Sequence, residues 1–268
     1  MAKKTAVAKK QKTAIVKQDA SVLLAQHSGD GLDDMTIDDL AIPFVRILQG
    51  RSPQVIKTNA DYIKGAEEGD IFNSATGALY KKGIRVVPVA FKKIYIEWRP
   101  RIDGGGYIAT HDPRSEFVKK TLGSGAKNDK GKPLTDAGNE LIETAQYYVL
   151  AVSDKGGSEK AVITMVSTQL KKSRRWNSMI ASRTLEDAEG REVPCPVFGA
   201  SYMLTTKGET YAGGDCMGWV IECVGPMEDV PVLQQAIDMR KGLDAVKVDY
   251  NQMQDGGPSV ATPVSDVF

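Results

Sequence analysis

The chain has 268 residues, of which 41% are hydrophobic, and 35 basic residues are balanced by 34 acidic ones. This length and apolar content can build a sizeable core, so disorder throughout is excluded, and the charge balance excludes a generally polycationic protein. No apolar run approaches the ~20 residues of a membrane-spanning helix, and the three cysteines form no Cys-x-x-Cys pair. We therefore expect a cytoplasmic protein without a membrane segment, whose affinity for any anionic polymer comes from local basic patches.

Charge is segregated at the beginning of the chain. Residues 1–18 carry six lysines and no acid, whereas residues 19–40 carry six aspartates and no base. Such blocks bury too little apolar surface to fold, so residues 1–35 are predicted to form a flexible arm. A single β-rich domain is expected over residues 36–250, and a disordered tail over 251–268, where Gly, Pro and Ser occur without periodicity.

Strands are predicted from about residue 70 onward, because Val, Ile and aromatic residues are broken there by Gly, Pro and Asn turns. The clearest alternation is "KKIYIEWR", residues 92–99. It places Ile94, Ile96 and Trp98 on a core face. The opposite, solvent-exposed face would then carry Lys93, Tyr95, Glu97 and Arg99. The "DGGG" turn at 103–106 lets Tyr107 begin a partner strand.

The second half of the domain reads as a hairpin, a helix, more strands and a last helix. Residues 145–153 and 160–168 form the hairpin around "DKGGSE". Over 169–183, "QLKKSRRWNSMIASR", the apolar period becomes helical. Strand signals return over 196–225, and an amphipathic helix follows over 229–247. The polar segment at 124–140 is expected to be an exposed loop.

This order of elements predicts the fold class. We expect an α+β fold that is mainly antiparallel β, in the form of an OB-like Greek-key barrel with an inserted helix, a C-terminal helix and flexible termini.

The sequence contains few of the residue patterns that a catalytic site requires. The two histidines are His27, in the arm, and His111, which is expected to be bonded to nearby backbone although it could serve as a general base. No glycine-rich phosphate loop and no metal-ligand spacing occur, and the cysteines fit small core positions. We therefore expect no enzyme, no metal and no cofactor.

Basic and aromatic residues gather in three stretches, residues 91–101, 104–114 and 170–183. Lys and Arg neutralise phosphates and release counterions, while aromatic rings stack on bases. The candidate nucleic-acid contacts are Lys92, Lys93, Tyr95, Arg99, Arg101, Tyr107, Lys171, Lys172, Arg174, Arg175 and Trp176. Tyr95, Tyr107 and Trp176 are the candidate stacking residues. Whether Trp98 and Trp176 belong to the core or stack on bases is left open by the sequence.

The end of the chain adds a second indication. "VSDVF", with Asp266 and the terminal Phe268 behind a Gly-Pro spacer, resembles the tail tip of replicative single-stranded DNA-binding proteins. The whole layout resembles a bacteriophage single-stranded DNA-binding protein of the OB-fold type. The resemblance implies a role in phage DNA replication or recombination in the host cytoplasm. It also implies that Asp266 and Phe268 recruit replication or recombination proteins.

Two other functions remain open at this point. The first is a phage structural or assembly protein that forms homo-oligomers through its charged segments. The second is an enzyme of DNA recombination or nucleotide metabolism. Stacking and phosphate contacts also serve RNA, so the sequence does not separate the two nucleic acids.

Overall fold

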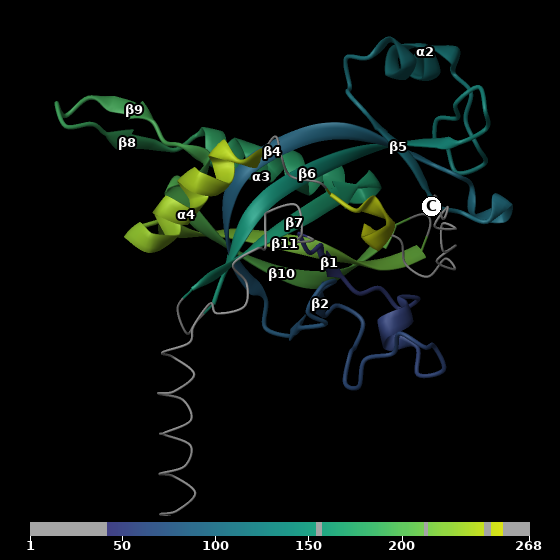
Figure 1. Ribbon diagram of the computed structural model, residues 1–268, viewed down its shortest axis with the longest axis horizontal. Helices are drawn as coiled ribbons and strands as arrows, with labels where there is room; N and C mark the ends of the chain where they lie inside the picture. Colours follow the sequence, from purple (N-terminus) through teal and green to yellow (C-terminus); the bar gives the residue numbers. More distant parts are fainter. Residues whose placement is uncertain (1–41, 154–156, 212–213, 244–247, 254–268) are drawn as a thin grey trace, which may run out of the picture. The chain divides into compact units, whose positions relative to one another are not determined.

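The computed structural model describes residues 42–153, 157–211, 214–243 and 248–253. The expected arm, most of the expected tail, and the two tail residues Asp266 and Phe268 lie outside these ranges. Within them, the fold is α+β and mainly antiparallel β, as expected (Figure 1). The helices of the described part are α2 (Glu116–Ser124), α3 (Leu170–Ala181) and α4 (Val230–Lys241).

A six-stranded antiparallel sheet forms the centre of the molecule. Its strands are β4 (Ile84–Trp98), β5 (Tyr107–His111), β6 (Glu140–Val152), β7 (Ser158–Val166), β10 (Ala200–Tyr211) and β11 (Gly214–Pro226). The order is β11-β10-β4-β6-β7, and β5 pairs with β4.

Shorter elements surround this sheet. A small sheet contains β1 (Val45–Ile47), β2 (Ile71–Asn73) and β3 (Leu79–Tyr80). A separate hairpin contains β8 (Thr184–Glu186) and β9 (Glu192–Pro194). Short 3₁₀ helices are η2 (Pro53–Val55), η3 (Arg101–Asp103), η4 (Ser167–Gln169), η5 (Val197–Gly199) and η7 (Tyr250–Met253).

Strand β4 organises the large sheet because it is shared by three partners. One edge pairs with β6 over nearly its full length, from Arg85 to Trp98. The other edge pairs with β10 at its start and with β5 at its end. The register with β6 shifts between Pro88 and Ala90. Proline has no N–H to donate, so a bulge here interrupts the ladder and lets the long strand bend.

The five long strands have the connectivity of an OB-fold. With β4, β6, β7, β10 and β11 as strands one to five, strand one lies between two and four, and α3 joins three to four. This connectivity agrees with the OB-like Greek-key barrel that the sequence predicts. The barrel is not closed, however, since among the described residues β7 and β11 do not pair with each other.

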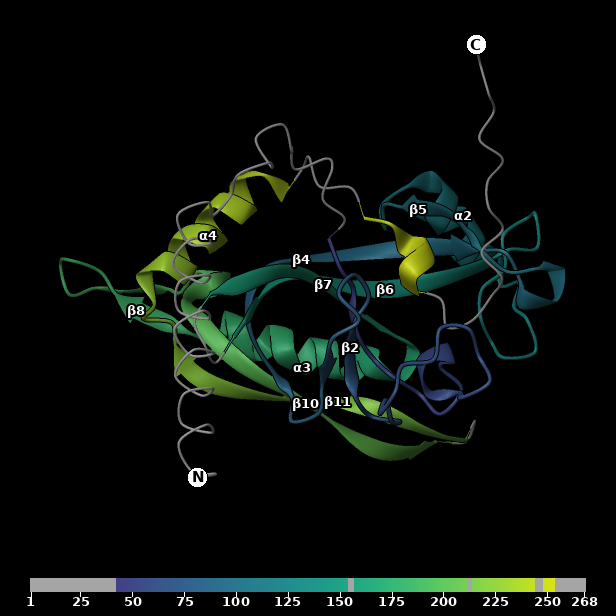
Figure 2. The same ribbon diagram turned by 60° about the horizontal axis from the view of Figure 1, so that its bottom comes forward.

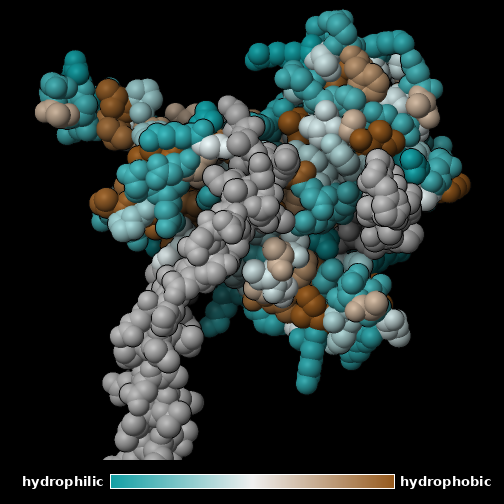
Figure 3. All heavy atoms as spheres, in the orientation of Figure 1, coloured by the Kyte–Doolittle hydropathy of each residue, from teal (hydrophilic) through white to brown (hydrophobic). Residues whose placement is uncertain are grey.

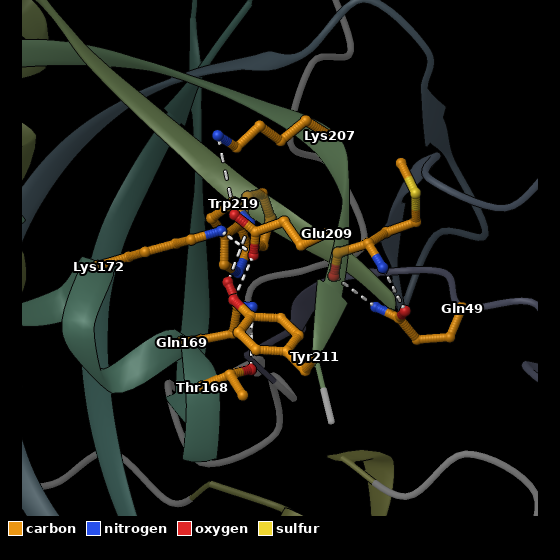
Figure 4. Close-up of polar contacts among 9 residues, drawn as sticks. Gln49, Thr168, Gln169, Lys172, Lys207, Glu209, Tyr211 and Trp219 are labelled. Atoms are coloured by element: carbon orange, nitrogen blue, oxygen red, sulfur yellow. Dashed lines mark hydrogen bonds and ion pairs between the residues drawn. The ribbon is translucent and has the colours of Figure 1, made fainter. Parts of the chain in front are cut away.

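The seam between β7 and β11 is filled by residues 42–49. Val162 of β7 donates its N–H to the carbonyl of Pro43 at 2.8 Å. On the other side, the Gln49 amide replaces a strand partner of β11: its Nε2 donates to the Met217 carbonyl at 3.0 Å, and its Oε1 accepts from the Met217 N–H at 2.8 Å. Gln169 Oε1 accepts from the Trp219 N–H at 3.0 Å (Figure 4). Side-chain amides thus satisfy part of the edge of β11.

Helix α3 fills the interior of the open barrel. Trp176 is 0% exposed, and its ring stacks on Tyr147 at 4.2 Å. Tyr147 Oη lies 2.7 Å from Ser173 Oγ, one turn earlier on the helix. Burial raises the pKa of Tyr147 to about 12. Helix α4 covers the outer face of the sheet with Val232, Ala236 and Met239, so the two helices lie on opposite sides of it (Figure 2).

An ion pair fastens the first turn of α3 to β10. Lys172 Nζ lies 2.6 Å from Glu209 Oε2, and the two side chains are 19% and 15% exposed. Glu209 also accepts a 2.7 Å bond from Tyr211 Oη. The hydrogen bond from Lys172 is the main cause that lowers the pKa of Glu209. A Cβ on Gly218 would collide with both charged groups, so any side chain at that position would displace the ends of Lys172 and Glu209.

Replacing Trp176 should destabilise the protein strongly. The change Trp176→Ala removes the ring from the barrel interior, and we expect a loss of about 3 to 5 kcal/mol in urea unfolding. The exposed Arg51→Ala serves as the control and should change stability by less than about 0.5 kcal/mol. Similar losses for the two variants would contradict the place of Trp176 in the core.

Replacing Glu209 should give a pH-dependent loss of stability. The folded pKa of Glu209 is lowered from 4.5, so its stabilisation is present above that value and fades as pH falls through the folded pKa. At neutral pH, Glu209→Gln should cost on the order of 1 kcal/mol. Urea unfolding at pH 7 and pH 3.5 should show the difference from wild type shrinking, whereas the exposed Glu222→Gln control shows none. A difference that persists unchanged at pH 3.5 would rule out the ion pair as its source.

Candidate nucleic-acid interface

The two lysines of β4 lie on opposite faces of the sheet and both have partners. Lys92 Nζ lies 5.6 Å from the ring centroid of Tyr148. Lys93 Nζ lies 2.9 Å from Glu143 Oε1 and 5.8 Å from the ring of Tyr95. The structure therefore does not bring Lys92 and Lys93 together on one surface.

The structure corrects the prediction that Tyr95 lies on a solvent-exposed face. Tyr95 is 7% exposed and packs with Val118 of α2 and with Leu141. The face of β4 that was expected to be wet is covered here by α2. A ring enclosed in this way presents no free face to a base, so the expected stacking role of Tyr95 is wrong.

Glu97 lies on the same covered face, and it is also 7% exposed. Its carboxylate lies 2.8 Å from His111 Nε2 and accepts a 2.7 Å bond from Asn139 Nδ2. His111 therefore bonds to a side chain, where backbone bonding was expected. Among the described residues, no three His, Cys, Asp or Glu side chains are grouped as a metal site would require.

The two tryptophans left open by the sequence both belong to the core. Trp176 is 0% exposed, which corrects its place among the stacking candidates. Trp98 is 9% exposed and meets Tyr107 edge-on at 6.0 Å. Tyr107 is half-buried, and its ring stacks on Tyr250 at 5.2 Å and 22°. One face of Tyr107 is thus already occupied by another aromatic ring.

The exposed side of α3 carries three cations, Lys171, Arg174 and Arg175, which we call the α3 stripe. Their spacing of three and four residues places them on one helix face. No residue of α3 is acidic, and across the described parts of the chain no carboxylate forms an ion pair with any of the three. Lys172 is separate from the stripe, because it is held by Glu209.

Arg99 and Arg101 line a pocket of about 720 Å³, which we call the strand-end pocket. It lies where the connection that follows β4 meets β6 and β7, with Ile142 and Val166 from those two strands. The other lining residues are Trp98, Pro100, Ile102, Asp103, Asn128, Asp129, Lys130, Lys132, Leu134, Gly138, Glu140 and Met253. Both arginines are exposed.

The pocket combines an apolar floor with a charged rim. Three of its lining residues, Asp103, Asp129 and Glu140, are acidic. Glu140 is neutralised in place, because Lys132 Nζ and Asn128 Nδ2 each lie 2.7 Å from its carboxylate. Ile102, at the tip of η3, is 93% exposed. A solvent-exposed isoleucine next to arginines can pack against the flat face of a base while the arginines bind the phosphates.

Of the predicted contacts, Arg99 and Arg101 are brought together in one concave site. Tyr107 lies beside this site, because its ring contacts Trp98, which is one of the lining residues. The α3 stripe forms a separate surface. Sequence reasoning missed Lys130 and Asn128, which were assigned to an exposed loop. It also missed Met253, which falls in the expected tail. These residues reach the pocket only through the folding of distant segments, so no local pattern marks them.

None of the helices in the described part of the chain is both long and apolar enough to cross a membrane. No curated protein and no solved structure matches the chain. A family model described as "Pam3 phage gp34-like protein" matches residues 9–249, which is most of the sequence and includes all of the large sheet. The chain therefore belongs to the Pam3 phage gp34-like protein family.

Proposed function

We propose that this phage-family protein binds single-stranded DNA at the strand-end pocket and serves phage DNA replication or recombination. One observation carries the proposal. The pocket lies between the connection after strand one and the faces of strands two and three, which is where OB-folds bind oligonucleotides. Two arginines that the sequence singles out, Arg99 and Arg101, line it.

The chemistry of the pocket suits a single strand. Arg99 and Arg101 can each pair with a phosphate and release its counterion, which gives affinity for any sequence. The apolar floor and Ile102 offer surface to unstacked bases. The bases of a duplex are stacked inside it and cannot reach such a floor. We therefore expect a preference for single strands over duplexes, without strong sequence selectivity.

Removing the two arginines should weaken DNA binding and reduce its salt dependence. The measurement is fluorescence anisotropy of a labelled oligo-dT at several salt concentrations, beside a duplex of equal length. For Arg99→Gln with Arg101→Gln, we expect affinity to fall about tenfold or more at low salt. The slope of log affinity against log salt is negative, and it should become shallower by about 0.7 for each phosphate that the variant no longer neutralises.

A charge-matched control separates a site from a general effect of charge. The pair Arg51→Gln with Arg240→Gln removes two exposed arginines that lie outside the pocket. This variant should bind oligo-dT nearly as wild type does. Absence of binding by wild type at low salt, or an equal loss in the control, would overturn the proposal.

A further inference from the structure

The β8–β9 hairpin is acidic and stands away from the body of the protein. It begins directly after α3 and projects beyond the end of that helix (Figures 1 and 3). Residues 184–194, "TLEDAEGREVP", contain four acids and one arginine, a net charge of −3. We call this segment the acidic hairpin.

The tip of the acidic hairpin has a defined shape. Asp187 Oδ1 accepts bonds from the backbone N–H groups of Glu189 and Arg191, both at 2.9 Å. Asp187 Oδ2 accepts a 2.8 Å bond from Arg191 Nε. These bonds lower the pKa of Asp187 and keep it charged, with the backbone N–H of Arg191 as the largest cause. Arg191 Nη2 also lies 2.8 Å from the Glu189 carboxylate, so Asp187 and Glu189 share this one arginine on a fixed turn, beside Glu186.

The strands of the acidic hairpin combine one supporting side-chain bond, from Thr184 Oγ1 to Glu192 Oε1 at 2.6 Å, with one repulsive pair. Glu186 lies directly opposite Glu192, and like charges at such a pair destabilise a ladder. Leu185 is 40% exposed. A lone two-stranded hairpin is marginal in water. A cationic surface placed against Glu186 and Glu192 would relieve the repulsion and support the hairpin.

The α3 stripe has the complementary charge. Lys171, Arg174 and Arg175 place three cations on one face of a helix that has no acid of its own. The net charge of −3 on the hairpin therefore matches three positive charges on the stripe. Electrostatic complementarity of this kind selects partners and sets their register.

The acidic hairpin cannot reach the α3 stripe of its own chain without breaking the junction between them. Ser182 donates its N–H to the Ser178 carbonyl at 3.0 Å, which continues the helix into the junction. The carbonyl of Arg183 accepts the N–H of Cys195 at 2.9 Å, which fixes the base of the hairpin. The direction of the hairpin, away from α3, is thereby set.

We propose that the acidic hairpin of one copy docks on the α3 stripe of a second copy of this chain. The contact joins different surfaces on the two copies, so it is head-to-tail and can propagate into a ring or a row. It does not rest on DNA binding at the strand-end pocket, because it uses other residues.

Sedimentation velocity of the full chain without nucleic acid tests the contact. At low salt we expect a mass well above the 29.0 kDa of one chain, and at about 0.5 M salt a return to the monomer, since salt screens exposed charges. The hairpin variant is Glu186→Lys with Glu189→Lys, and the stripe variant is Arg174→Glu with Arg175→Glu. Each alone should be monomeric at low salt.

Mixing the two variants gives the sharpest test. The basic hairpin of the first variant then meets an acidic helix, and the acidic hairpin of the second meets a basic helix. Association should return in the equimolar mixture. The control Arg51→Glu with Arg240→Glu should associate as wild type does, and circular dichroism should show all variants folded.

Three outcomes would overturn the proposal. These are a wild-type monomer at low salt, a stripe variant that associates as well as wild type, and a mixture that stays monomeric. A stripe variant that still associates is the result expected if the hairpin docks instead on the six lysines of residues 1–18. DNA binding can succeed or fail independently of each result.

Discussion

The open seam between β7 and β11 is the constraint on which the rest of the structure depends. A barrel that closed by pairing these strands would have no room for residues 42–49, and the side-chain bonds of Gln49 and Gln169 to β11 would be unnecessary. Because the seam is open, α3 can insert Trp176 deep among the strands. The same insertion turns the Lys171, Arg174 and Arg175 face of the helix outward. The core and one charged surface therefore have a common cause.

Charge in this protein is sorted by position. The net charge is only +1, but the protein has an acidic hairpin, a cationic helix face and a pocket whose rim carries charges of both signs. The strand-end pocket adds an apolar floor to its arginines, which suits a ligand that has both phosphates and bases. The α3 stripe has cations without such a floor, which suits a partner recognised by charge. The two surfaces therefore suit different partners.

Local patterns were enough to predict much of the fold. The helical period over 169–183 matches α3 at Leu170–Ala181, and the hairpin signal matches β6 and β7. Helix α2 was missed, although Ser115 accepts the Val118 N–H as an N-cap and Gly125, with φ of 71°, ends the helix. That omission led to the error on Tyr95, because strand alternation shows which residues share a face but not what covers it. The pocket could be predicted only in part, since Lys130 and Met253 reach it through long-range folding.

Binding of single-stranded DNA at the strand-end pocket is tested most directly by titrating isotope-labelled protein with oligo-dT and following the backbone amide shifts by NMR. If DNA binds there, the largest shifts will occur in residues 99–103 and 128–130 and at Ile142, around the strand-end pocket. Amides of α4, on another part of the sheet, should stay in place. Shifts confined to α3 or α4, or no shifts at all at low salt, would contradict the claim that this pocket holds single-stranded DNA.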